Sequence, residues 1–227
     1  MKSDRVKSTE LVVFGHRGSG SGAGENTLDS ITRALDAGAA GVEVDARRTR
    51  DGRVVLAHEP VVDGLTIIDT DYERLAERGV ALLTDALELA RGRGRVIVEV
   101  KNQAWEPDFD APDEATVAAL VPLLAEADDV VVSSFDFYAA EAARDAGLRC
   151  GFLSMPGVRP AAAIAYAADA SLDEVHVWVG DVLGEPRCVE AAAAAGLALV
   201  AWTAHSVEQL DALRDLGVPA AISDVIA

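Results

Sequence analysis

Cysteine, aromatic residues and basic residues are all scarce in this sequence of 227 residues. The two cysteines, Cys150 and Cys188, are too few for a disulfide framework and do not have a zinc-type spacing. The apolar runs are short and interrupted, and none approaches the roughly 20 residues that a membrane-spanning helix needs. There is also no Gly-x-Ser-x-Gly elbow, no phosphate-loop lysine motif and no dinucleotide fingerprint. The sequence therefore argues against a disulfide-stapled protein, a cysteine zinc site, a membrane-spanning helix, an α/β-hydrolase and the common nucleotide-binding folds.

The charge is strongly one-sided, with 20 Lys and Arg against 38 Asp and Glu and a formal net charge of −18. Such a balance argues against a nucleic-acid partner and against stable membrane association, because both need clustered basic residues. A small phosphorylated substrate remains compatible, since one local cationic site can override the global field at short range. The polar N-terminus is not followed by an apolar signal segment, so we expect a cytoplasmic protein. The oligomeric state is left open.

Short β-rich runs alternate with segments rich in alanine and leucine, as expected for parallel strands covered by helices. The expected strands are 11–15, 41–46, 95–100, 130–134, 149–153, 174–178, 198–202 and 220–223. The expected helices are 28–37, 84–91, 113–126, 138–146, 160–168, 185–195 and 206–216. This alternation predicts an α/β fold, a (β/α)8 TIM barrel, with a doubly wound open sheet as the alternative.

Two further features complete the expected organisation. Residues 47–50 and 53–58 flank the turn Asp51-Gly52 and predict a small β-hairpin after the second strand. The connection 101–112 is acidic, carries Trp105 and Phe109, and follows a strand end, which is where barrel active sites lie. We expect residues 1–10 to be disordered or extended and residues 11–227 to form a single domain.

The first strand ends in Gly15-His16-Arg17-Gly18. His16 can exchange protons near neutral pH, and Arg17 can hold phosphate oxygens in a bidentate manner. A loop histidine beside a solvated arginine is the structural alternative. Further along, the polar residues Glu25-Asn26-Thr27 precede the first expected helix. Asn26 or Thr27 can cap that helix, and Glu25 can reach the same pocket and orient Arg17.

Acidic residues follow a two-residue period on the next two strands. Glu43 and Asp45 share one face of the second strand, and Glu99 and Lys101 share one face of the third. Two buried like charges on one side are costly without a cation. Three acids from neighbouring strands therefore predict a site for one hard divalent cation, Mg²⁺ or Ca²⁺. A solvated acidic edge, or a simple ion pair between Glu99 and Lys101, is the structural alternative.

Three more positions are candidates for the site. His58 closes the hairpin, which can return it to the mouth that holds His16, so that two histidines would supply a general acid and a general base. Trp202 ends the seventh strand, where an aromatic ring can pack against the substrate. The two remaining histidines are weaker candidates, His176 as a core or mouth residue and His205 as a rim residue.

Taken together, these residues resemble the glycerophosphodiester phosphodiesterase family. The resemblance rests on motifs in the family's order and approximate spacing: GHRG at 15–18, ENT at 25–27, EVDARRTRDGRVVLAHE at 43–59, VEVK at 98–101, SSF at 133–135 and AWT at 201–203. It implies a TIM barrel that hydrolyses glycerophosphodiesters to glycerol 3-phosphate and an alcohol. It also implies one divalent cation and a small-molecule glycerophosphodiester as the partner.

The resemblance assigns roles to the matching positions. His16 and His58 would be the catalytic acid–base pair, without a decision as to which is the acid, and the glycerol 2-hydroxyl would be the nucleophile that forms a cyclic phosphate. A metal would be bound by Glu43, Asp45 and Glu99. The substrate would be contacted by Arg17, Lys101, Glu25 and Trp202.

The chain departs from the family pattern at two positions. Glu59 stands where an aspartate commonly follows the second histidine, and His205 stands where an asparagine is common. These departures leave the alcohol head group open. Two alternatives also remain: a lipid phosphodiesterase of the phospholipase D-toxin or phosphoinositide phospholipase type, and a barrel that binds a phosphodiester without turnover.

Overall fold

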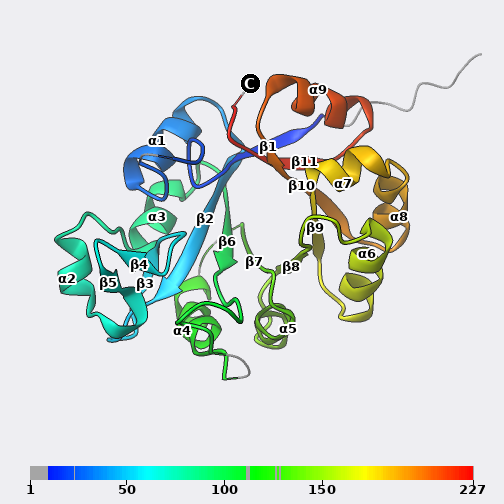
Figure 1. The fold of residues 1–227 in the computed structure, drawn as a ribbon. Helices are drawn as coiled ribbons and strands as arrows, with labels where there is room; N and C mark the ends of the chain where they lie inside the picture. The colour runs from blue at the N-terminus through cyan, green and yellow to red at the C-terminus, as the bar shows by residue number, and fades with distance from the viewer. Residues whose placement is uncertain (1–9, 23, 111–112, 126, 128, 227) are drawn as a thin grey trace, which may run out of the picture.

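The computed structural model describes residues 10–22, 24–110, 113–125, 127 and 129–226. The expected disordered or extended segment 1–10 therefore lies outside the described residues, apart from its last position. Within the described part, eight parallel strands form a ring that closes through the pairing of the first strand with both the second and the last. This closure confirms the (β/α)8 barrel and excludes the open sheet (Figure 1).

The barrel strands follow one another around the ring in chain order. They are β1 (Val12–Gly15), β2 (Gly41–Arg48), β6 (Arg95–Val100), β7 (Val130–Ser134), β8 (Cys150–Leu153), β9 (Glu174–Trp178), β10 (Ala198–Ala204) and β11 (Ala220–Ser223). Four of these strands have the predicted bounds, and the others differ from them by one or two residues at an end.

Helices surround the ring and cover the outer face of the strands (Figure 1). They are α1 (Leu28–Asp36), α3 (Leu83–Ala90), α4 (Ala115–Leu124), α5 (Phe137–Asp145), α6 (Pro160–Asp169), α7 (Val179–Gly184), α8 (Cys188–Ala194) and α9 (Val207–Asp215). The helix predicted over 185–195 begins only at Cys188, and α7 precedes it as a separate short helix that the sequence pattern did not reveal.

The predicted hairpin is present, with β3 (Val54–Leu56) antiparallel to β2. The chain then builds a small projection that the sequence analysis did not predict, from β4 (Val61–Val62), β5 (Leu65–Thr66), a 3-10 turn η1 (Ile67–Asp69) and α2 (Tyr72–Ala76). Elements this short have no measurable periodicity, which explains why they were missed. They pack on a small apolar cluster of their own.

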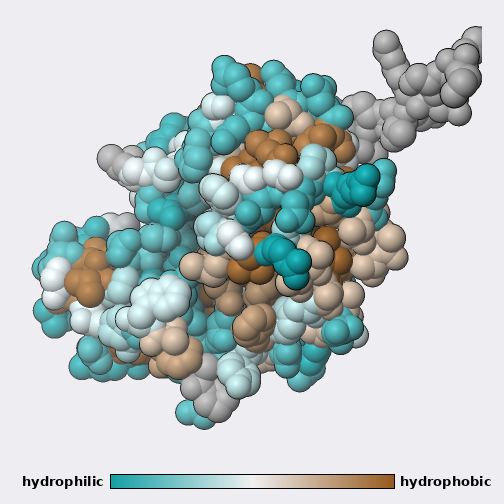
Figure 2. All heavy atoms as spheres, turned by 45° about the vertical axis from the view of Figure 1, so that its right-hand side comes forward, coloured by the Kyte–Doolittle hydropathy of each residue, from teal (hydrophilic) through white to brown (hydrophobic). Residues whose placement is uncertain are grey.

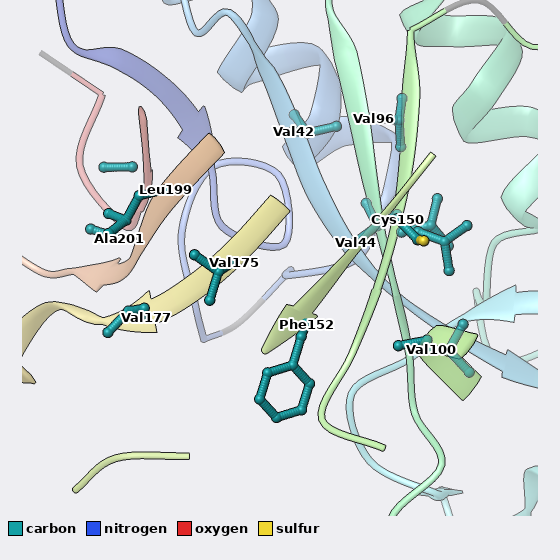
Figure 3. Packing of buried hydrophobic residues seen from close by; sticks show 14 of the residues in the cluster. Val42, Val44, Val96, Val100, Cys150, Phe152, Val175, Val177, Leu199 and Ala201 are labelled. Carbon is teal, nitrogen blue, oxygen red and sulfur yellow. The ribbon is translucent and has the colours of Figure 1, made fainter. Parts of the chain in front are cut away.

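The side chains on the outer and inner faces of the barrel strands belong to two separate hydrophobic cores. The outward residues pack against the helices and form the large core, which includes Val42, Val44, Val175 and Val177 (Figure 3). The inward positions carry a small apolar layer of Phe14, Ile97, Val200 and Ile222, with polar residues above and below it. The two-residue period of the strands thus sends every second side chain into the barrel, including the charged ones.

The molecular surface reflects the composition. Figure 2 shows one face on which hydrophilic residues cover much of the area and apolar residues gather in patches toward the middle and the right. Among the described residues, none of the helices combines the length and the apolar character needed to cross a membrane.

Candidate active site

Two neighbouring strands, β2 and β6, place the predicted acids side by side. β1 pairs with β2, and β2 pairs with β6, all in parallel, so their carboxyl ends meet at one end of the barrel. Asp45 lies opposite Glu99 in the register between β2 and β6, and Glu43 precedes Asp45 by two residues on the same face. The strand geometry alone therefore brings three carboxylates together at the end where TIM barrels carry their active sites.

The three carboxylates form one compact buried group. Glu43, Asp45 and Glu99 each offer an oxygen atom, and these oxygens lie within 4.8 Å of one another. Each residue is at least nine-tenths buried. Burial and the charges of Asp45 and Glu99 raise the pKa of Glu43 well above its ordinary value. The group is thus unfavourable in its fully ionised form unless a positive charge offsets it.

Two fixed cations neutralise part of this charge. The Lys101 ammonium lies 2.8 Å from Glu99 Oε1 and 3.5 Å from Asp45 Oδ1. The Arg17 guanidinium lies 3.2 Å from Asp45 Oδ2 and donates a hydrogen bond of 2.8 Å to Glu25 Oε1. Burial acts to raise the pKa of Asp45, but Lys101 and Arg17 outweigh it and hold that pKa below the usual value. The three carboxylates outnumber the two cations, and Arg17 is also shared with Glu25, so the two cations do not fully offset the group in its ionised form.

The donor set fits a hard divalent cation. Glu43 Oε2 accepts a hydrogen bond of 3.0 Å from the Arg17 backbone, but Oε1 of the same carboxylate is buried without a partner among the described residues. A buried carboxylate oxygen without a donor is costly unless something positive approaches it. Carboxylate oxygens are the ligands that Mg²⁺ and Ca²⁺ prefer. The predicted metal ligands are therefore together and correctly composed for such an ion.

The segment before α1 supports the site from one side. Thr27 is the N-cap of α1, because its hydroxyl accepts a hydrogen bond of 3.1 Å from the Ser30 backbone. This frees Asn26, whose side chain donates to Asp45 Oδ2 at 2.8 Å and accepts from the Asp45 backbone at 3.0 Å. Glu25 contacts Arg17 as predicted. The sequence analysis treated Asn26 as a possible cap and missed its contact with Asp45.

The hairpin returns His58 to the acidic group. The backbone N–H of Ala57 donates a hydrogen bond of 3.0 Å to the Asp45 carbonyl, so the following residue lies beside the strand that carries the acids. The imidazole is close enough that it contributes to lowering the pKa of Asp45. Its Nδ1 lies 2.8 Å from Glu59 Oε1. Glu59, which stands where an aspartate is common in the family pattern, thus contacts the His58 imidazole directly.

Arg47 holds the backbone of His58 in place, and the sequence analysis did not identify this residue. Its side chain is fully buried and donates to the His58 carbonyl from Nη2 at 2.5 Å and from Nε at 3.1 Å. The same guanidinium binds Glu106 at 2.8 Å and Asp108 at 2.6 Å. Arg47 lies two residues after Asp45 and so shares the inward face of β2 with Glu43 and Asp45. This spacing could have identified Arg47 as a residue of the site. Its partners lie on a distant loop that the sequence could not place.

A carboxylate at the end of the last strand joins two histidines. Asp224 Oδ1 lies 2.7 Å from Nδ1 of His16, and Oδ2 lies 2.6 Å from Nδ1 of His205. Ser21 donates to the same carboxylate from its backbone at 2.9 Å and from its hydroxyl at 3.1 Å. Burial acts to raise the pKa of Asp224, but the hydrogen bonds from His16, Ser21 and His205 outweigh it and lower that pKa well below its usual range. His205 is thus a rim residue, as predicted.

Asp224 was missed because it follows the last predicted strand by one residue. The available signal was its position, since the first residue after a barrel strand lies at the mouth. Trp202 also lies at this end, partly buried on β10, with its ring edge-to-face to Phe135 at a centroid distance of 5.1 Å. His176, in contrast, is fully buried and lies 3.0 Å from Glu174. It belongs to the core and not to the mouth.

Comparison with known proteins decides the family. A sequence model of the glycerophosphoryl diester phosphodiesterase family matches residues 16–227, almost the whole chain. The chain belongs to this family. It is therefore an enzyme of the glycerophosphodiester phosphodiesterase class, which confirms the resemblance found in the sequence and excludes the barrel without turnover.

Individual relatives agree with this assignment. A glycerophosphodiester phosphodiesterase of Caldanaerobacter subterraneus is 24% identical, over 95% of this chain and 94% of its own. A solved glycerophosphodiester phosphodiesterase of Parabacteroides distasonis superimposes with a TM-score of 0.82 at 20% identity, over 96% of this chain and 94% of that one. A phosphodiesterase of Oleispira antarctica, solved with the product sn-glycerol-3-phosphate, has a TM-score of 0.79 at 23% identity, over 94% and 93%. The two structural matches support the fold.

Proposed function

We propose that this enzyme hydrolyses glycerophosphodiesters with one divalent cation held by Glu43, Asp45 and Glu99, and with His16 and His58 as its acid–base pair. The observation that carries the proposal is the buried group of three acids, in which one Glu43 oxygen has no partner among the described residues. His58 influences Asp45 of this group, and His16 directly follows β1, which pairs with β2. A purely structural ion cluster would be balanced, because uncompensated buried charge is costly. When bound, a Mg²⁺ or Ca²⁺ ion would supply positive charge to the phosphodiester oxygens.

Arg17 and Lys101 are the proposed phosphate contacts. Both lie beside the acidic group, and Lys101 uses its ammonium for two carboxylates, which leaves one of its three donors for a ligand. Arg17 is held in place through Glu25 and Asp45. Such preorganised donors stabilise the charge that builds on the phosphate oxygens during the reaction without reorganising at that moment.

The partners of the histidines define which nitrogen atom reacts. The Nδ1 atom of His16 lies on Asp224 and that of His58 lies on Glu59, and an ionised carboxylate only accepts hydrogen bonds. Nδ1 is therefore the protonated nitrogen in each ring, and Nε2 is left to exchange protons with the substrate. Trp202 would contact the substrate from the opposite wall of the mouth.

The two imidazoles remove and supply one proton each in the proposed reaction. One imidazole Nε2 takes a proton from the attacking oxygen, a bond forms between that oxygen and phosphorus, and the bond from phosphorus to the alcohol oxygen breaks. The other imidazole, protonated at Nε2, gives its proton to the departing alkoxide. By similarity to the family, the attacking oxygen is the glycerol 2-hydroxyl, and the first product is a cyclic phosphate. In the second step a water oxygen bonds to phosphorus and the bond from phosphorus to the glycerol 2-oxygen breaks. The imidazole that gave up its proton takes one from the water, and the other returns its proton to the glycerol 2-oxygen. The products are glycerol 3-phosphate and an alcohol.

A substrate panel tests the proposal. Glycerophosphodiesters of choline, ethanolamine, glycerol and inositol are incubated with the enzyme in EDTA, Mg²⁺ or Ca²⁺, and the release of glycerol 3-phosphate is measured with a coupled assay. We expect no turnover in EDTA and recovery with one of the two cations. Full turnover in EDTA would overturn the metal assignment.

A further inference from the structure

Exposed apolar side chains are concentrated on one half of the active-site mouth. Among the described residues, ten large apolar side chains are exposed, and seven of these lie at or just after the carboxyl ends of β6, β7, β8 and β9. The seven are Trp105, Phe109, Phe137, Tyr138, Met155, Val158 and Trp178. A chain with only 5% aromatic residues has five of them exposed here. Single exposed apolar residues need no explanation, but a gathered set marks a binding surface.

Four of these seven residues, Trp105, Phe109, Tyr138 and Met155, line an open groove. Its volume is about 320 Å³, at the lower end of the range for small-molecule sites. Trp105, Phe109, Phe135, Tyr138 and Met155 supply its apolar lining. The groove is therefore large enough for part of a substrate and has the chemistry to hold an apolar part.

The groove adjoins the residues of the proposed catalytic site at two points. Asn102, which lines the groove, directly follows Lys101, the proposed phosphate contact. On the other side, Phe135 lines the groove and packs against Trp202 in the mouth. The indole N–H of Trp202 is buried without a partner among the described residues. A phosphodiester bound at Lys101 would thus have one of its two ester groups beside the groove.

The polar character of glycerol decides which ester group fits. The glycerol moiety carries two hydroxyl groups, which lose hydrogen bonds to water when an apolar wall covers them. The apolar groove therefore suits the other ester group, the alcohol that leaves. An aromatic lining also attracts quaternary ammonium groups. A carboxylate directed at the ligand would strengthen the binding of such a cationic group.

The carboxylate in the groove is already occupied. Among the described lining residues, Asp136 is the only acid, and it accepts hydrogen bonds from the Asn102 side chain at 2.9 Å and from the Tyr138 backbone at 3.2 Å. Its Oδ2 and Oδ1 atoms are thus both engaged within the protein. The groove therefore favours an apolar chain over a cationic head group.

We propose that this groove binds an apolar chain on the leaving alcohol, so that the substrate class includes glycerophosphodiesters of alkyl-bearing alcohols. The proposal rests on the proposed function, because it assumes that the phosphodiester lies at Lys101. It assigns Trp105 and Tyr138, which are strongly exposed, a role in selecting the substrate.

A series of leaving groups tests the proposal. Glycerophosphodiesters of methanol, butanol and octanol are assayed below the critical micelle concentration, and kcat/KM is measured from glycerol 3-phosphate release. A fully buried methylene group contributes roughly a fourfold gain, so the octyl ester is expected to exceed the methyl ester by at least about tenfold even in an open groove. A flat series in an enzyme that cleaves the methyl ester would overturn this proposal and leave the proposed function intact.

Substitutions in the groove test whether its residues cause the preference for the octyl ester. Trp105→Ala and Tyr138→Ala are expected to lower the ratio of octyl to methyl kcat/KM, each at an unchanged melting temperature. Val12→Ala, at the opposite end of the barrel, is the matched control and keeps the wild-type ratio. If kcat/KM for the octyl ester rises only above the critical micelle concentration, the enzyme is attracted to a lipid aggregate, and the groove proposal is overturned. If the enzyme cleaves the choline, ethanolamine, glycerol or inositol ester but no ester of this series, the groove proposal is overturned. If it cleaves none of either set, the proposed function itself is overturned.

Discussion

Glu43 and Glu174 are the same residue type, both are almost fully buried on barrel strands, and their pKa values move in opposite directions. Burial and two neighbouring acids raise the pKa of Glu43. Burial also acts on Glu174, but hydrogen bonding to His176 and the charges of His176, Arg149 and Arg95 lower its pKa. Burial alone therefore does not identify a functional carboxylate. The balance of charge around it does.

The two clusters lie at opposite ends of the barrel. Glu174 is the first residue of β9, and its Oε1 binds Arg149 at 2.8 Å and Arg95, which comes from β6, at 3.4 Å. Its Oε2 binds His176 at 3.0 Å. Both of its carboxylate oxygens are thus partnered, as in a structural ion cluster. At the other end, three acids face two cations, and one Glu43 oxygen has no partner in the described part of the chain, which indicates a site that suits a cation.

The largest effect is expected from a substitution at the active-site mouth that leaves the ion cluster at the amino ends of the strands unchanged. His16→Ala removes one proposed proton carrier, so turnover should fall by roughly 10²- to 10⁴-fold. Cation binding should persist, because His16 is not among the proposed ligands. Near-normal turnover, measured by glycerol 3-phosphate release, would remove the acid–base assignment.

A smaller loss is expected from Asp224→Asn. The amide can donate to Nδ1 of His16 and thereby favour the wrong tautomer, so kcat should fall roughly 10- to 100-fold with a displaced pH profile. His205→Asn is the matched control, because it removes the second imidazole but leaves the contact between Asp224 and His16. An equal loss in both variants would show that the contact with His16 is not what matters.

Glu174→Gln tests the other end of the barrel. The neutral side chain leaves Arg95 and Arg149 without their buried anion, so the free energy of unfolding should fall by about 1.5–3 kcal/mol while kcat is retained. Because the folded pKa of Glu174 is lowered, its stabilisation is present above the unfolded pKa and is lost as the pH falls through the folded value. Denaturant unfolding between pH 7 and pH 3 should show a flatter pH dependence in the variant. A wild-type slope would contradict the pairing.

The smallest effect concerns Glu114, which accepts a hydrogen bond of 3.1 Å from Asn102. Burial and the charges of Asp136 and Asp110 raise the pKa of Glu114 to about 7. An acid with a raised folded pKa contributes stability below its unfolded pKa, and this contribution is lost as the pH rises through about 7. Glu114→Gln should therefore reduce the loss of stability between pH 5 and pH 8, as measured by melting temperature. An unchanged slope would show that Glu114 titrates normally.

The fold was largely predictable because its signals are local. The strands β6, β7, β9 and β11 are short segments rich in apolar and β-branched residues, and their predicted bounds match the structure. The projection built from β4, β5 and α2 was not predictable, since elements of two to five residues carry no period. The same limit hid α7.

The site was predictable where the period of a strand carried it and was missed where distant segments meet. Glu43, Asp45 and Glu99 follow from the two-residue period of β2 and β6. Asp224 reaches His16 across 208 positions, and Arg47 reaches Asp108 across 61 positions. Such pairings depend on closure of the barrel and on loop conformation, which no local pattern encodes.

Calorimetric titration of the EDTA-treated protein with Mg²⁺ and Ca²⁺ tests the central contrast most directly. We predict that the wild type and Glu174→Gln each bind one divalent ion per chain, and that Glu43→Gln binds it at least tenfold more weakly. Binding that is unchanged in Glu43→Gln, or lost in Glu174→Gln, would contradict the assignment of the acid excess at the carboxyl ends of the strands as the cation site.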